Sequence, residues 1–272
     1  MRWGKSLIFV LLANAAGLLA EATIECEGTY SGHLQGVATQ GDEYIFWSFT
    51  NTLVKTGIQG KILVKVSVDS HSGDLCVQDD KIYVAVNLGE FNQEPGKADS
   101  WVYVYDAEKL ELQARHSIPE AVHGAGGMDF NDGSFYVVGG LPEGYQENYV
   151  YQYDPEFNFV KRHVIESGYT LMGIQTACFS RGYWWFGCYG DPRETIQADP
   201  DFNMVKRFQF DCSLGLTRYG KGLFVAEGFD RYRGRISFTE DLTRISHELT
   251  TAAAYTFVLT ALCSAGLPSV AY

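Results

Sequence analysis

Five stretches of this chain repeat one short pattern, and this self-similarity constrains the fold more than any other feature. HLQGVATQGDEYIF aligns without a gap with HSGDLCVQDDKIYV, and GGMDFNDGSFYV, TACFSRGYWWF and GLTRYGKGLFV continue the series. Successive copies lie 38 to 53 residues apart, so the chain must fold into an architecture assembled from one small motif. We call the matching residue of each copy its anchor, and the five anchors are Gly36, Asp74, Gly127, Thr176 and Gly215.

Each copy predicts a set of short antiparallel strands. A strand around the anchor meets a tight polar turn such as QGDE or NDGS, and an aromatic, β-branched strand such as YIFWSFT follows. WVYVYD and NYVYQYD then alternate apolar and polar residues with the period of two that is typical of a half-buried strand. The 29 glycines and the 34 tyrosines and phenylalanines also favour strands and turns over long helices.

Self-similar units of four short strands resemble the repeats of the β-propeller superfamily. The resemblance covers nearly all of residues 23–248 and implies an all-β fold, a five-bladed β-propeller of four-stranded antiparallel blades. It matches no specific enzyme family, so it implies a fold and no activity. ATIECEG (residues 22–28) is expected to close the ring by joining the outer edge of the last blade. A β-sandwich with similar strands is the alternative.

Composition narrows the classes of partner. The hydrophobic content of 46% suffices for a core, and the formal net charge is −12. Such an acidic chain repels phosphate backbones, so we expect no nucleic-acid partner and favour a neutral or cationic ligand.

The two ends of the chain differ from the repeats. Residues 1–22 have the form of a signal peptide, with Arg2 and Lys5 ahead of an apolar run and small residues around Ala22, which predicts a secreted or periplasmic protein. Residues 249–272 carry no charge, and their role is open between a loosely docked extension and a membrane anchor. A membrane partner is expected only if this tail is an anchor.

Four side chains near the anchors form a candidate metal site. The repeat places the residues just before each anchor at the mouth of the central channel, on one face of the propeller. His33, His71, His123 and Cys212 would therefore come from four consecutive blades, and imidazole with thiolate suits zinc, iron or copper. The alternative is a hydrogen-bonded polar ring. A Cys188–Cys212 disulfide, which an exported protein permits, would remove Cys212 from the set.

The same face supplies candidates for catalysis and binding. Asp74 replaces glycine at its anchor, and it could act as a general base or merely orient His71. The loops over this face are long and rich in glycine, aromatic and charged residues, whereas the opposite face has only tight turns. The predicted ligand-binding side chains are Gln35, Gln175, Glu90, Glu143, Asp191 and Arg193.

These observations predict an exported propeller that binds a small polar ligand, with a sugar or an oxidised sugar as the candidate, in a His/Gln/Asp-lined funnel. Two function classes follow. One is a metal-assisted hydrolase or lyase with His33, His71 and His123 as ligands. The other is a non-catalytic binding module that uses the same face for its ligand or for a protein partner.

Overall fold

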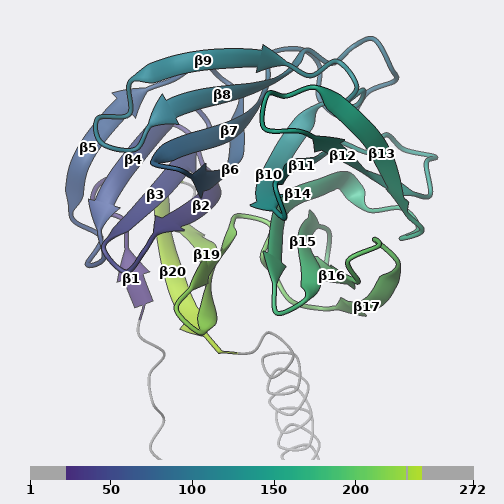
Figure 1. Cartoon of the computed structure of the whole chain (residues 1–272). Helices are drawn as coiled ribbons and strands as arrows, with labels where there is room; N and C mark the ends of the chain where they lie inside the picture. Colours follow the sequence, from purple (N-terminus) through teal and green to yellow (C-terminus); the bar gives the residue numbers. More distant parts are fainter. Residues whose placement is uncertain (1–22, 231, 241–272) are drawn as a thin grey trace, which may run out of the picture.

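A computed structural model describes residues 23–230 and 232–240, and they form five four-stranded antiparallel sheets arranged around one axis (Figure 1). The predicted five-bladed β-propeller is confirmed. The predicted signal peptide (1–22) and tail (249–272) lie outside the described residues, as do residues 241–248 of the predicted domain. Among the residues that the structure describes, no helix has the length and hydrophobicity to cross a membrane.

The blades follow the chain in order, and each begins at the axis with its first strand. Blade 1 comprises β2 (Leu34–Gln40), β3 (Tyr44–Phe49), β4 (Thr52–Gly57) and β5 (Ile62–Ser67). Blade 2 comprises β6 (Ser72–Gln78), β7 (Lys81–Asn87), β8 (Ser100–Asp106) and β9 (Leu112–Ser117). Blade 3 comprises β10 (Ala125–Asn131), β11 (Ser134–Gly139), β12 (Asn148–Tyr153) and β13 (Phe159–Ile165). Blade 4 comprises β14 (Leu171–Ser180), β15 (Tyr183–Tyr189), β16 (Glu194–Ala198) and β17 (Met204–Phe208).

Blade 5 is completed by the start of the described chain. It comprises β18 (Leu216–Tyr219), β19 (Gly222–Asp230), β20 (Arg233–Thr239) and β1 (Thr23–Glu25). β1 pairs antiparallel with β20, with Ile24 opposite Ile236, and the two strands lie side by side in Figure 1. The expected closure of the ring by the N-terminal strand is therefore confirmed.

The packing between blades explains why one unit cannot fold alone. Five clusters of buried side chains lie one at each interface between neighbouring blades. Successive strand residues point to opposite faces, so Phe46 packs toward blade 2 while Trp47 packs toward blade 5. Trp184 and Trp185 likewise enter the clusters on the two sides of blade 4. Each sheet thus needs a neighbour on both faces, and only a closed ring provides both.

The first strands of blades 1 to 4 share an irregularity that positions the site. Their pairing register shifts just before the anchor, between Leu34 and Gly36, Ser72 and Leu75, Ala125 and Gly127, and Ile174 and Thr176. A bulge inserts an extra residue into one strand and re-aims its side chain. The bulged residues lie at the end of the channel that the long loops cover.

Candidate functional site

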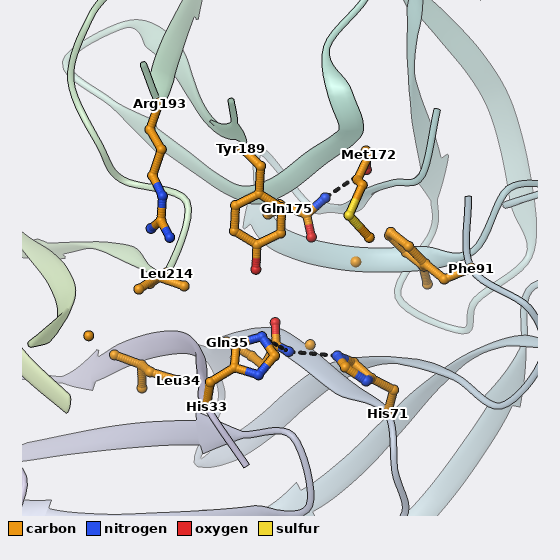
Figure 2. Close-up of a pocket in the computed structure, with 14 residues that line it drawn as sticks. His33, Leu34, Gln35, His71, Phe91, Met172, Gln175, Tyr189, Arg193 and Leu214 are labelled. Carbon is orange, nitrogen blue, oxygen red and sulfur yellow. Dashed lines mark hydrogen bonds between the residues drawn. The ribbon is translucent and has the colours of Figure 1, made fainter. Parts of the chain in front are cut away.

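A cavity of about 640 Å³ opens at the channel mouth on the face of the long loops. Every blade contributes to its wall, and loop residues from blades 2, 4 and 5 extend it outward. Its lining residues are His33, Leu34, Gln35, His71, Gly73, Phe91, Ala125, Gly126, Met172, Gln175, Tyr189, Arg193, Leu214 and Gly228 (Figure 2).

The floor of this cavity is a ring made from one position of the repeat. The residue immediately before each anchor lines the cavity in all five blades. In blades 1 to 4 this residue lies within the register shift, which accounts for its direction toward the axis. In blade order the ring, which we call the floor ring, is Gln35, Gly73, Gly126, Gln175 and Leu214.

Gln35 joins the two histidines of the cavity wall. Its amide nitrogen lies 2.9 Å from Nε2 of His33 and 2.6 Å from Nε2 of His71, as the dashed lines in Figure 2 mark. An amide nitrogen donates both of its hydrogens, so each Nε2 accepts and each ring carries its proton on Nδ1. Although His71 keeps an exposed edge, desolvation by the surrounding walls lowers its pKa, which also favours the neutral ring. The two imidazoles are therefore a neutral pair held by one amide.

Gln175 is the floor-ring residue of blade 4, and its amide nitrogen is bound within its own strand. Nε2 donates to the Met172 carbonyl oxygen at 2.7 Å. Figure 2 shows the amide oxygens of Gln35 and Gln175 and the Tyr189 hydroxyl turned toward the same open space. Burial raises the pKa of Tyr189, so its hydroxyl keeps its proton at neutral pH.

The next layer down is filled by Asp74, which has no exposed surface. A Cβ at Gly36 would overlap the Asp74 carboxyl and a Cβ at Gly127 would lie 3.1 Å from the Asp74 Cβ, so these two glycine anchors leave room for this side chain. Oδ2 accepts from the Ala177 amide of blade 4 at 3.3 Å, across the channel, while Oδ1 is buried without a partner among the described residues. Desolvation raises the pKa of Asp74 well above its ordinary value, despite the backbone amides that favour the charged form.

An ion pair lies at the far end of the channel. Arg218 of blade 5 donates to both carboxylate oxygens of Asp129 in blade 3, at 2.8 and 3.0 Å, and to the Phe179 carbonyl of blade 4 at 2.6 Å. The Asp129 carboxylate raises the pKa of Arg218. With Asp74 above it, this pair fills the axis beneath the cavity.

The predicted metal ligands are not brought together. His123 is 2% exposed, and its Nδ1 lies 2.8 Å from the Gln93 carbonyl oxygen, away from the cavity lining. Cys212 is fully buried, with its sulfur 3.0 Å from the Thr195 hydroxyl. His33 and His71 remain close, with ring centroids 6.1 Å apart, but no group of three or more His, Cys, Asp or Glu within residues 23–230 and 232–240 is placed to hold a metal ion.

Asp74 does not lie where its predicted catalytic role would require it. Its carboxyl lies beneath the floor ring and lines no part of the cavity, so as it stands it cannot reach a molecule bound above. It does not orient His71 by a hydrogen bond either, since its Oδ2 accepts from the Ala177 amide and the His71 Nε2 is bound to Gln35. The carboxyl instead occupies the space that the neighbouring glycine anchors leave open.

Of the four predicted binding residues in the loops, one lines the cavity and three do not. Glu90, Glu143 and Asp191 are exposed and lie outside the cavity lining. Arg193 does line the cavity, with its guanidinium 5.4 Å from the centroid of the Tyr189 ring. Its Nη1 donates to Asp211 at 2.7 Å and to the Ser213 hydroxyl at 3.2 Å. The positive charge is thus compensated within the protein.

Sequence reasoning missed most of the apolar lining. Leu34, Phe91, Met172 and Leu214 were not among the predicted residues, nor was the hydroxyl of Tyr189. The missed members of the floor ring could have been found, because Gly73, Gly126 and Leu214 share the repeat position of Gln35 and Gln175. For Phe91, Met172 and Tyr189 the repeat holds no such signal, since the loops differ from blade to blade.

The cysteines are buried thiols. Cys26, Cys76, Cys178, Cys188 and Cys212 are all free, so the disulfide considered for Cys188 and Cys212 is not formed. Burial raises the pKa of Cys26 and Cys212 to about 12, which keeps both thiols protonated and unreactive. Cys263 lies outside the described residues.

Comparisons with known proteins add little to this description. No family model matches the chain, and no curated protein matches it. Among solved structures, a nidogen/laminin complex aligns with a TM-score of 0.47 at 11% identity, over 71% of this chain and 72% of that one. A protein of unknown function from Bacteroides caccae aligns with a TM-score of 0.46 at 16% identity, over 74% of this chain and 73% of that one. At such low similarity, neither structure is informative about the site.

Proposed function

We propose that this chain is an exported β-propeller that binds a small polar ligand in the cavity at its channel mouth. The observation that carries the proposal is the floor ring, because all five blades direct one equivalent residue into one cavity of about 640 Å³. Small-molecule sites are typically concave, mostly apolar and about 300–1,000 Å³ in volume, with a few convergent polar groups. The amide oxygens of Gln35 and Gln175 and the Tyr189 hydroxyl supply such groups here (Figure 2).

The geometry favours binding over metal-assisted hydrolysis or elimination. Such a reaction would need three or more ligands around one ion and a base in contact with the substrate. His33 and His71 have their Nε2 atoms engaged by Gln35, His123 is turned away, and Asp74 lies beneath the floor. The concave shape likewise favours a small molecule over the flat surface that a protein partner usually contacts.

Export is part of the proposal, and the predicted cleavage is compatible with the described fold. Cleavage after Ala22, as the signal sequence predicts, would leave β1 intact from Thr23 onward. The closing strand of blade 5 would then be present in the mature chain.

A blocked variant tests ligand binding at this site. Gly126→Leu adds a side chain at the cavity floor, where a Cβ would lie 3.2 to 3.4 Å from its neighbours and needs only small shifts. Gly57→Leu is the matched control, because a Cβ there meets nothing within 4 Å and the residue lies outside the cavity lining. A fragment library is screened by ligand-observed NMR against the wild type and both variants.

We expect fragments that bind the wild type and Gly57→Leu but lose at least about tenfold in affinity for Gly126→Leu, or about 1.4 kcal/mol. Both variants must unfold cooperatively, as measured by denaturant titration. Absence of binding, or binding that Gly126→Leu leaves unchanged, would reject the proposed function.

A further inference from the structure

We infer that the cavity selects a neutral or cationic small molecule that presents N–H or O–H hydrogen-bond donors from a flat body. This inference rests on the proposed function and specifies its ligand class. It follows from the direction of the two amide groups, from the charges around the cavity and from the two glycines between the amides.

Both amides offer acceptors to the cavity. The Gln35 nitrogen is used by His33 and His71, and the Gln175 nitrogen is used by the Met172 carbonyl. Each glutamine is only 6% exposed, so its orientation is determined by these internal bonds. The exposed part of each amide is its oxygen (Figure 2), which can only accept. A buried acceptor left without a donor is unfavourable, so a ligand that displaces water from these oxygens has to supply N–H or O–H groups.

Among the described residues that line the cavity, Arg193 is the only cationic side chain, and its charge is already paired with a carboxylate. The Arg193 guanidinium is paired with Asp211 at 2.7 Å. His33 and His71 each have Nε2 accepting from Gln35 and are neutral. Asp74 beneath the floor contributes no positive charge in either protonation state. Within the described lining, a carboxylate or phosphate would therefore face two carbonyl oxygens and would have to compete with Asp211 for Arg193, the one cation there.

The floor between the two glutamines has no side chains. In the floor ring, Gly73 and Gly126 lie between Gln35 and Gln175. The Phe91 ring packs against this side, since a Cβ at Gly126 would lie 3.3 Å from its Cζ atom. A planar group can pack beside Phe91 on this part of the floor, while its donors reach an amide oxygen.

Three probes of equal size separate these requirements. Benzamide is neutral and has two amide donors, benzamidine is cationic and has four, and benzoate is anionic and has none. Their affinities are measured by ligand-observed NMR at pH 7.5 with the full-length protein. We expect benzamide and benzamidine to bind at least about tenfold more tightly than benzoate, a difference of about 1.4 kcal/mol.

Gln175→Met tests the acceptor directly, because it keeps the length of the side chain and removes the oxygen. We expect a loss of about tenfold or more in benzamide and benzamidine affinity. Gln197→Met is the matched control: Gln197 is 8% exposed, lies in β16 and is not part of the cavity lining, so its variant should bind both probes as the wild type does.

The outcomes separate this inference from the proposed function. Benzoate binding as tightly as benzamide, or donor probes that bind Gln175→Met unchanged, would overturn the inference. If the fragments lost in Gly126→Leu are carboxylates while benzamide and benzamidine do not bind, the cavity is a ligand site of the opposite polarity. If no fragment binds at all, both the ligand class and the proposed function are wrong.

Discussion

At the scale of single residues, Asp74 illustrates how one substitution in a repeat changes the channel. The anchors of blades 1 and 3 are glycines, and the aspartate of blade 2 occupies the space beside them. Its carboxyl is fully buried and reaches the Ala177 amide across the channel. A buried carboxyl with one oxygen unpaired is more stable when protonated, and desolvation raises its pKa accordingly.

Asp74→Asn should gain stability relative to the wild type as the pH rises. Above the ordinary pKa near 3.8 the unfolded chain releases this proton, while the folded protein retains it because its pKa is raised. The wild type therefore loses stability with rising pH, by at most about 1.4 kcal/mol per pH unit for one proton, up to the pKa of the folded state. Asparagine has no proton to lose and lacks this dependence.

Urea unfolding of both proteins at pH 5 and pH 8, followed by tryptophan fluorescence, measures the difference. The contributions of the histidines cancel between the two proteins, since the other titratable groups are shared. A difference that moves in the opposite direction would mean that Asp74 is ionised in the folded state.

The residues at the channel mouth also show how much of a site can be predicted from a sequence repeat. His33, Gln35, His71 and Gln175 lie in the cavity wall, at the end of the channel where the spacing placed them. His123 stands four residues before its anchor where His33 and His71 stand three before theirs. It lies in the turn before β10 and is buried behind the lining, so a difference of one residue in spacing accompanies a different position. The depth of Asp74 could not be predicted, because it depends on the absence of side chains at Gly36 and Gly127.

At the scale of elements, β1 closes the ring although it is only three residues long. Ile24 is partly buried against the cluster between blades 5 and 1, while its neighbour Thr23 is exposed. The backbone of Glu25 lies so close to Gly60 that no side chain would fit there. The strand therefore joins blade 5 by its hydrogen bonds and packs against blade 1 by its side chains.

Ile24→Asp should destabilise the ring by about 1–3 kcal/mol, because it places a charge in an apolar contact. Thr23→Asp introduces the same charge one residue earlier on the exposed side, where a change within about 0.5 kcal/mol is expected. Denaturant unfolding at neutral pH measures both. Equal effects of the two substitutions would show that β1 does not pack as described.

The strands themselves were predictable, but their irregularities were not. Alternation and turn residues predicted the blades, and the hairpin at NDGS has Asp132 and Gly133 at φ 46° and 75°, the left-handed pair that a two-residue turn requires. The register shifts next to the anchors cannot be seen in the sequence alignment, because the first strands of blades 1 to 4 all have one there. They decide which side chains enter the cavity.

At the scale of the whole molecule, the ring is stabilised by five apolar interfaces and one closing strand. The five cysteines of the described residues form no disulfide, even though the predicted export route would permit one. The prediction that a hydrophobic core holds this fold agrees with this arrangement. The ring was predictable because it follows from the repeat, whereas the loops over the cavity follow from no repeat.

Thiol labelling tests this description. In a Cys263→Ser background, the native protein, produced by the proposed export route, should not react with a maleimide at pH 7.5, because its remaining thiols are buried and burial raises their pKa values. After unfolding in urea without reductant, intact mass should show five adducts. Three adducts would instead reveal a Cys188–Cys212 bond.

The pairing of Arg218 with Asp129, together with Asp74 above it, makes the cavity a blind well. Nothing can thread through the propeller from one side to the other while these groups stay in place. A molecule that enters the cavity must leave through the same opening, under the loops that carry Phe91 and Arg193. Those loops therefore control both access and release.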